Sequence, residues 1–119
     1  MSIDPIQTLV GVRTAVGVSS WAAPRVAGRA FGLDVDGNPQ APYLARLFGI
    51  RDVALAAGVR QSTGDARRAW LKLGLLCDAM DAAAGELARR DGSLPPFAAV
   101  LVTGTALAAV GLGVAALQQ

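Results

Sequence analysis

Five ionisable residues of this 119-residue chain lie deep inside apolar stretches, where charges are rare: Arg13, Arg51, Asp52, Asp78 and Asp81. A carboxylate can activate water or abstract a proton, and a neighbouring carboxylic acid can protonate an oxygen. An arginine can orient both groups and stabilise developing negative charge. If these residues meet, they predict acid–base catalysis of epoxide opening, double-bond isomerisation or cyclisation of a small lipophilic substrate.

The composition excludes most other catalytic classes. The chain has no histidine and one cysteine, Cys77, so it offers no Ser-His or Cys-His pair, no zinc site of the usual spacing and no internal disulfide. It also lacks the glycine patterns that cradle phosphates. The net charge of +2 comes from scattered arginines rather than a basic run, which argues against a nucleic-acid partner. We therefore expect no metal, no cofactor and no nucleic acid.

The positions of the five charges depend on the elements that carry them, and the clearest element is residues 97–117. No charge interrupts this stretch, and at 1.5 Å per residue it can cross a hydrocarbon core of about 30 Å. Within it, Thr105, Ala109 and Gly113 have the small-xxx-small spacing that admits a close helix neighbour in lipid. We expect a transmembrane helix with a homo-oligomeric or other membrane partner on this face. The alternative is a wholly buried core helix of a soluble protein.

Three further stretches, 6–23, 43–61 and 66–88, have similar lengths but carry charges near their midpoints. Each has an aromatic ring near one end, Trp21, Tyr43 and Trp70, as is typical of segments that meet a membrane interface. Short connections indicate antiparallel neighbours, and residues 24–33 predict a short interfacial helix. The sequence therefore predicts an all-α fold. We expect residues 1–119 to form one integral membrane domain, an antiparallel bundle of four transmembrane helices with both termini on one side of the membrane.

In this arrangement the five charges share one depth near the centre of the bilayer. Each would cost about 2.5–3.5 kcal/mol at a lipid-facing helix centre, so we expect them to face inward and meet. Asp78 and Asp81 share a helix face, whereas Arg51 and Asp52 point about 100° apart, one toward the first helix and one toward the third. Three carboxylates face two arginines, Arg13 and Arg51, and a low-dielectric site favours protonation of one carboxylate.

A pattern of residues over nearly the whole chain, except the last helix, is similar to a known group of proteins. It comprises Gly-Val-Arg13 with Gly17, Phe31-Gly32-Leu33, the run from Pro42-Tyr43 to Arg51-Asp52, and Asp78-x-x-Asp81. The pattern resembles small four-helix integral membrane proteins of bacteria, DoxX-like in general appearance. The resemblance implies a multi-pass protein of the bacterial inner membrane and implies no established activity.

The sequence leaves the function open between different classes. In the first hypothesis the five charges line a polar pocket, and the protein is a cofactor-independent hydrolase, isomerase or cyclase. In the second it is a non-enzymatic membrane subunit or packing partner of a larger complex, and the charges hold helices together. Proton or ion conduction is a third hypothesis and would require an oligomer.

Overall fold

A computed structural model describes residues 3–119, which form five α-helices and no strand. The helices are α1 (Pro5–Ala22), α2 (Pro24–Ala30), α3 (Ala41–Gln61), α4 (Gly64–Asp91) and α5 (Pro96–Leu117). The all-α prediction is confirmed, and the four long helices begin and end within a few residues of the predicted bounds. The predicted short helix is α2, although it ends earlier than expected, at Ala30.

Proline sets the start of four helices, with Pro5, Pro24, Pro42 and Pro96 in the first turns of α1, α2, α3 and α5. Its fixed φ suits a helix, and its missing N–H would have no partner in the first turn. In α1 the side chain of Asp4 adds a cap by accepting a hydrogen bond of 3.0 Å from the backbone N–H of Ile6. These local signals explain why the predicted helix starts lie close to the observed ones.

The end of α4 has a different cause. Gly92 follows the helix with φ +80°, a left-handed conformation that glycine adopts without strain. The chain can then fold back, and the Ser93 N–H donates a 3.0 Å hydrogen bond to the carbonyl of Ala88. This closure is a Schellman-type ending, and it carries α4 past the end predicted at residue 88.

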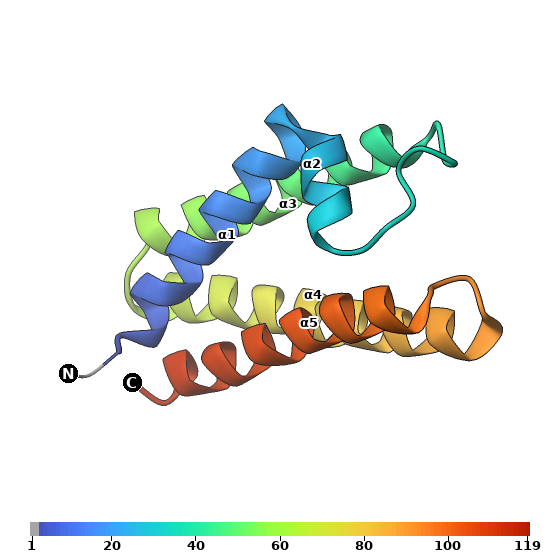
Figure 1. Cartoon of the computed structure of the whole chain (residues 1–119). Helices are drawn as coiled ribbons and strands as arrows, with labels where there is room; N and C mark the ends of the chain where they lie inside the picture. Colours follow the sequence, from blue (N-terminus) through green and yellow to red (C-terminus); the bar gives the residue numbers. More distant parts are fainter. Residues whose placement is uncertain (1–2) are drawn as a thin grey trace.

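The helices are arranged in two layers, with α1 against α3 and α4 against α5 (Figure 1). Contacts of α3 with α4 and of α1 with α5 join the layers. Within residues 3–119, α1 makes no close backbone contact with α4, nor α3 with α5. These two pairs are therefore the diagonals of a four-helix bundle. The start of α1 and the end of α5 lie at the same end of the bundle (Figure 1). There Leu9, Val59, Leu71 and Ala116 form a buried apolar cluster.

The connection from α2 to α3 crosses the opposite end of the bundle. α2 packs on α1 and α3, and the turn after it has φ +77° at Gly32. A Cβ at Gly32 would lie 3.0 Å from the ring of Phe97, so the turn touches the first residues of α5. Farther along, Asp34 accepts a 2.8 Å hydrogen bond from the backbone N–H of Gly37. The segment is thus a local turn that also contacts the second layer.

Within the described residues, α5 is the one helix long and apolar enough to cross a membrane by length and composition. The other three predicted spans carry ionisable residues and do not meet the same criterion. Only 17% of the apolar 18-residue window of α5 is buried inside the protein. It is therefore not the wholly buried core helix that the soluble alternative requires. A path that crosses the membrane four times stays a prediction.

The small residues predicted as one partner face of α5 do not form a single outward surface. Gly113 is buried, and a Cβ there would lie 3.4 Å from Leu75 of α4. Ala109 packs against the apolar cluster, whereas Thr105 is exposed. Two of the three residues thus already pack against the protein itself, and a membrane partner at Thr105, Ala109 and Gly113 stays a prediction.

Glycines also bring α1 and α3 into backbone contact. A Cβ on Gly17 would lie 2.6 Å from the carbonyl oxygen of Gly49, and a Cβ on Gly49 would lie 2.6 Å from that of Gly17. No real Cβ tolerates such a distance to a backbone atom, so the two helices would have to separate. By contrast, Gly11 on α1 has open space around its Cβ position.

We therefore predict that Gly49→Ala lowers the free energy of unfolding by about 1–3 kcal/mol, as overpacking does in a close-packed interior. Gly11→Ala is the matched control, and it should be neutral or stabilising by up to about 1 kcal/mol because alanine favours helix. Far-UV circular dichroism of the purified protein during a denaturant titration measures both. Equal effects of the two substitutions would contradict the close α1–α3 contact.

Candidate functional site

The five predicted residues form one row of alternating charge through the bundle. In spatial order the row is Asp78, Arg13, Asp52, Arg51 and Asp81, and we call it the charge chain. It draws its side chains from α1, α3 and α4. The prediction that these charges meet is confirmed.

The most buried link of the charge chain joins Arg13 of α1 to Asp78 of α4. Arg13 donates from Nη1 to Oδ1 of Asp78 at 3.1 Å and from Nη2 to Oδ2 at 2.5 Å. Such a two-point contact is the strongest form of a charge-assisted hydrogen bond. Only 6% of Arg13 and 4% of Asp78 are exposed. The pair passes through the bundle interior because α1 and α4 are diagonal helices.

Room for this guanidinium comes from Gly74, one helical turn before Asp78 on the same face of α4. A Cβ at Gly74 would lie 2.9 Å from Nη2 of Arg13. Sequence reasoning missed this residue. The signal was present, since a glycine four positions before a buried charge lies directly beside it on a helix.

The second two-point link joins Arg51 of α3 to Asp81 of α4, with distances of 3.1 Å from Nη1 to Oδ1 and 2.6 Å from Nη2 to Oδ2. The guanidinium carbon also lies 4.8 Å from the ring centre of Phe48, a cation–π distance. These two charged side chains are 34% and 33% exposed, so the expectation that all five charges face inward was wrong here. The reason is that α3 and α4 are adjacent helices, and a link between neighbours lies on the side of the bundle.

Asp52 occupies the centre of the charge chain without a close partner for one of its oxygens. Its Oδ1 is 3.9 Å from Nη1 of Arg13 and 3.8 Å from Nη2 of Arg51, and both distances exceed hydrogen-bond length. Among the described residues this buried oxygen accepts no hydrogen bond, although only 6% of Asp52 is exposed. The two arginines are each held by another aspartate, so Asp52 is the surplus carboxylate of the charge chain.

The directions of Arg51 and Asp52 confirm the helix geometry expected of consecutive residues. Arg51 reaches Asp81 on α4, whereas Asp52 approaches Arg13 on α1. Asp78 and Asp81 share one face of α4 as predicted, and each receives a guanidinium from a different helix.

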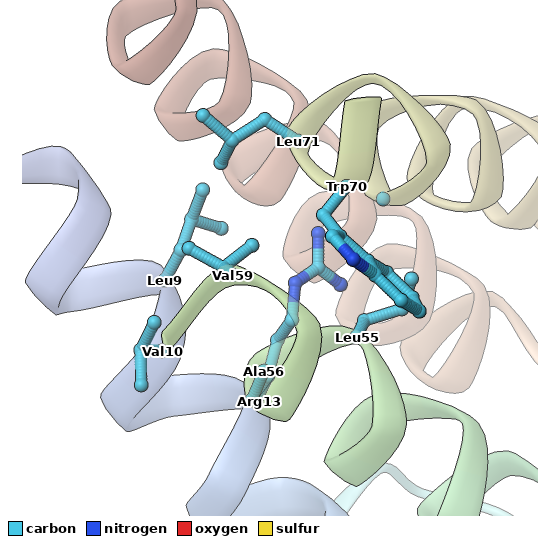
Figure 2. A pocket seen from close by; sticks show the side chains of 9 residues that line it. Leu9, Val10, Arg13, Leu55, Ala56, Val59, Trp70 and Leu71 are labelled. Atoms are coloured by element: carbon cyan, nitrogen blue, oxygen red, sulfur yellow. The ribbon is translucent and has the colours of Figure 1, made fainter. Parts of the chain in front are cut away.

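A small cavity lies beside Arg13, between α1, α3 and the first half of α4 (Figure 2). Its volume is about 10 Å³, close to what one water molecule needs. Apart from Arg13, its lining is apolar or aromatic: Leu9, Val10, Leu55, Ala56, Val59, Trp70, Leu71 and Gly74. Asp52 is not among these residues. The cavity therefore has room for a water molecule but not for a lipophilic substrate.

We predict unequal effects of neutralising the two buried aspartates. Asp78→Asn should lower the free energy of unfolding by about 3–5 kcal/mol, because the buried guanidinium of Arg13 loses its two-point partner. Asp52→Asn should change it by less than about 1 kcal/mol, because both two-point ion pairs survive and each is neutral overall. A denaturant titration followed by circular dichroism measures both.

Asp65→Asn is the matched control, since Asp65 is exposed in the first turn of α4. An exposed substitution of this kind usually stays within about 0.5 kcal/mol. A loss at Asp52 as large as that at Asp78 would contradict the assignment of Asp52 as the surplus carboxylate.

No family model matches this chain, and no curated protein or solved structure matches it either. The resemblance to small DoxX-like membrane proteins therefore stays a prediction. The geometry of the charge chain and of the surface around it is the basis for the function proposed next.

Proposed function

We propose that this protein is a multi-pass integral membrane protein whose four long helices cross the bilayer, and that it acts as a non-enzymatic packing subunit. One observation carries the proposal: large apolar side chains are exposed along the outside of the long helices, while charged side chains lie buried inside the bundle. The interior holds Arg13, Asp52 and Asp78. The outside of the long helices carries exposed large apolar side chains, including Val12, Val18, Leu44, Leu47, Ile50, Leu73, Leu76, Met80, Leu87, Val100, Leu107 and Val114.

In water such a distribution is unfavourable, because exposed leucine, isoleucine and valine order solvent and large apolar patches associate. In hydrocarbon the same surface is well solvated, and the buried charges are shielded from lipid by the surrounding helices. The dimensions agree with this placement. The long axis of the protein is 44 Å, and a bilayer with its headgroups is about 40–45 Å thick.

The charge chain supports a bracing role rather than catalysis. Both arginines are bound at two points by aspartates, and these contacts hold each guanidinium against α4. The adjacent cavity, about 10 Å³ in volume, has room for about one water molecule and no substrate. Removal of either link would leave an uncompensated charge at the bilayer centre. The charge chain thus fixes how α1, α3 and α4 sit relative to one another.

A partner helix in the membrane would meet the lipid-facing side of α5. Gly104 and Gly111 have open space around their Cβ positions, so a second helix can approach the backbone there. Of the predicted partner face, only Thr105 is exposed on the outside. This placement keeps the expected homo-oligomer or membrane partner and moves its contact toward Gly104 and Gly111.

The natural cysteine allows a direct test of the membrane placement. Cys77 adjoins Asp78 near the middle of α4 and is only partly buried, so hydrocarbon rather than protein should shield it. We expect a membrane-impermeant maleimide to leave Cys77 unlabelled in intact membranes and to label it after solubilisation in SDS. Two single-cysteine variants on a Cys77→Ser background, Ser62→Cys and Ser93→Cys, mark the two ends of α4. They should react from opposite sides of the membrane.

Ser62→Cys lies in the α3–α4 turn and Ser93→Cys in the α4–α5 turn, so the pair also tests the number of crossings. Reaction of both from the same side would contradict a membrane crossing by α4. Rapid labelling of Cys77 in intact membranes, or recovery of the protein in the soluble fraction, would overturn the membrane placement altogether.

Asp52 favours a second candidate function, the acid–base chemistry predicted from the sequence. Its Oδ1 is buried and accepts no hydrogen bond within the described part of the chain. A surplus carboxylate in a low-dielectric site is suited to carry a proton. In this function Asp52 would be the acid or base, and a lipophilic substrate would have to enter by widening the space beside Arg13.

A hydrophobic carbodiimide tests this candidate, because such reagents react with protonated carboxyl groups in apolar surroundings. We expect dicyclohexylcarbodiimide to modify Asp52, as located by peptide mass spectrometry. Asp52→Asn should remove the modification, and Asp65→Asn should leave it unchanged. Modification elsewhere, or none, would argue against Asp52 as a proton-carrying group and leave the bracing role alone.

A further inference from the structure

A groove lies at the end of the bundle where α1 meets α2 and α3 begins. Its volume is about 370 Å³, and it is lined by Ala23, Pro24, Arg25, Val26, Pro42 and Arg46. It is open to the outside and separate from the charge chain. Two of its six lining residues are arginines, so its chemistry differs from the apolar outer surface of the long helices.

The groove lies at the depth of a bilayer interface if the charge chain lies at the centre. Ala23 follows Arg13 by ten residues, and Pro42 precedes Asp52 by ten. At 1.5 Å per residue each distance is about 15 Å along the helix. Half the thickness of a hydrocarbon core is also about 15 Å. Two helices that run in opposite directions therefore place the groove where lipid phosphates are found.

The two arginines have donors to spare. Arg46 donates from Nε to the backbone carbonyl of Trp21 at 3.1 Å, and within residues 3–119 neither of its Nη groups makes a hydrogen bond or an ion pair. Arg25 is exposed and, within residues 3–119, makes no ion pair or hydrogen bond. Nearby Arg29 is paired with Asp36 at 2.7 Å, so that aspartate does not neutralise the groove.

The surroundings suit a molecule that is both anionic and apolar. Trp21, Val26 and Tyr43 are exposed at this end of the bundle, and aromatic rings favour the membrane interface. From Tyr43, the exposed side chains of Leu47 and Ile50 continue toward the middle of α3. Their spacing places all three on one helix face. An acyl chain could lie along this face while its headgroup stays in the groove.

We propose that this groove binds the phosphate of an anionic phospholipid through the guanidinium groups of Arg25 and Arg46. The planar fork of arginine matches phosphate oxygens at two points, and the exposed α3 face takes the acyl chains. The inference rests on the proposed membrane placement. It adds a specific lipid ligand at one end of the bundle.

Native mass spectrometry of the detergent-purified protein, titrated with phosphatidylglycerol or phosphatidylcholine, tests the proposal. The wild-type protein should bind phosphatidylglycerol at least about tenfold more tightly, a ratio that corresponds to 1.4 kcal/mol. Arg25→Gln with Arg46→Gln should remove this preference. Arg25→Gln alone should weaken it, and it breaks no hydrogen bond of the fold.

Arg60→Gln with Lys72→Gln is the matched control. Both residues are exposed and lie toward the other end of the bundle, so the control changes the net charge equally and should keep the lipid preference. Loss of the preference in the control would show a general charge effect and overturn the site. Retention in the Arg25/Arg46 variant would also overturn it.

Inorganic phosphate and glycerol phosphate distinguish a lipid from a free anion. If either displaces phosphatidylglycerol at millimolar concentration, the groove is a soluble-phosphate site and the lipid proposal fails. If neither does, the acyl chains are part of recognition. The cysteine-labelling test separates this inference from the membrane placement: a protected Cys77 together with no lipid preference removes the lipid site alone.

Discussion

The two-point contact between Arg13 and Asp78 is the interaction on which the rest of the bundle depends. It connects the diagonal helices α1 and α4, whose backbones do not approach one another. The hydrogen bonds between Arg13 and Asp78 therefore fix the distance between these two helices across the interior. A guanidinium in that position needs space, and Gly74 provides it. It also needs α1 in a defined place, and the Gly17–Gly49 contact holds α1 against α3. Three glycines of the long helices, Gly17, Gly49 and Gly74, are thus tied to the position of this buried ion pair.

In this arrangement the five charged residues have different roles. Each arginine is bound at two points by one aspartate, so the positive charges hold helices in position. Asp52 is left between them, too far from either for a hydrogen bond. A structural brace and a reactive carboxyl group can therefore coexist in one row of side chains. The brace is common to both candidate functions, and only Asp52 distinguishes them.

Much of the fold follows from local signals in the sequence, since prolines start four of the five helices of residues 3–119 and long, largely apolar stretches set the lengths of the long helices. Consecutive residues on a helix point about 100° apart, and this angle correctly predicted that Arg51 and Asp52 face different helices. The sequence could not tell which aspartate each arginine binds, because Asp78 and Asp81 share one face of α4. That choice depends on which helices are diagonal and which adjacent. For the same reason the exposure of Arg51 and the use of Gly113 inside the bundle were not predicted.

The two layers are joined covalently only at the turn between α3 and α4, around Ser62 and Thr63. At the far end, Gly32 rests against Phe97 without a covalent link. The attachment between the two layers is therefore stronger at the α3–α4 turn than at the far end. A relative movement would pivot at the turn like a hinge and have its largest amplitude near Gly32. The ion pairs Arg13–Asp78 and Arg51–Asp81 lie halfway along and connect the two layers. They therefore oppose a separation of the layers at the end far from the turn.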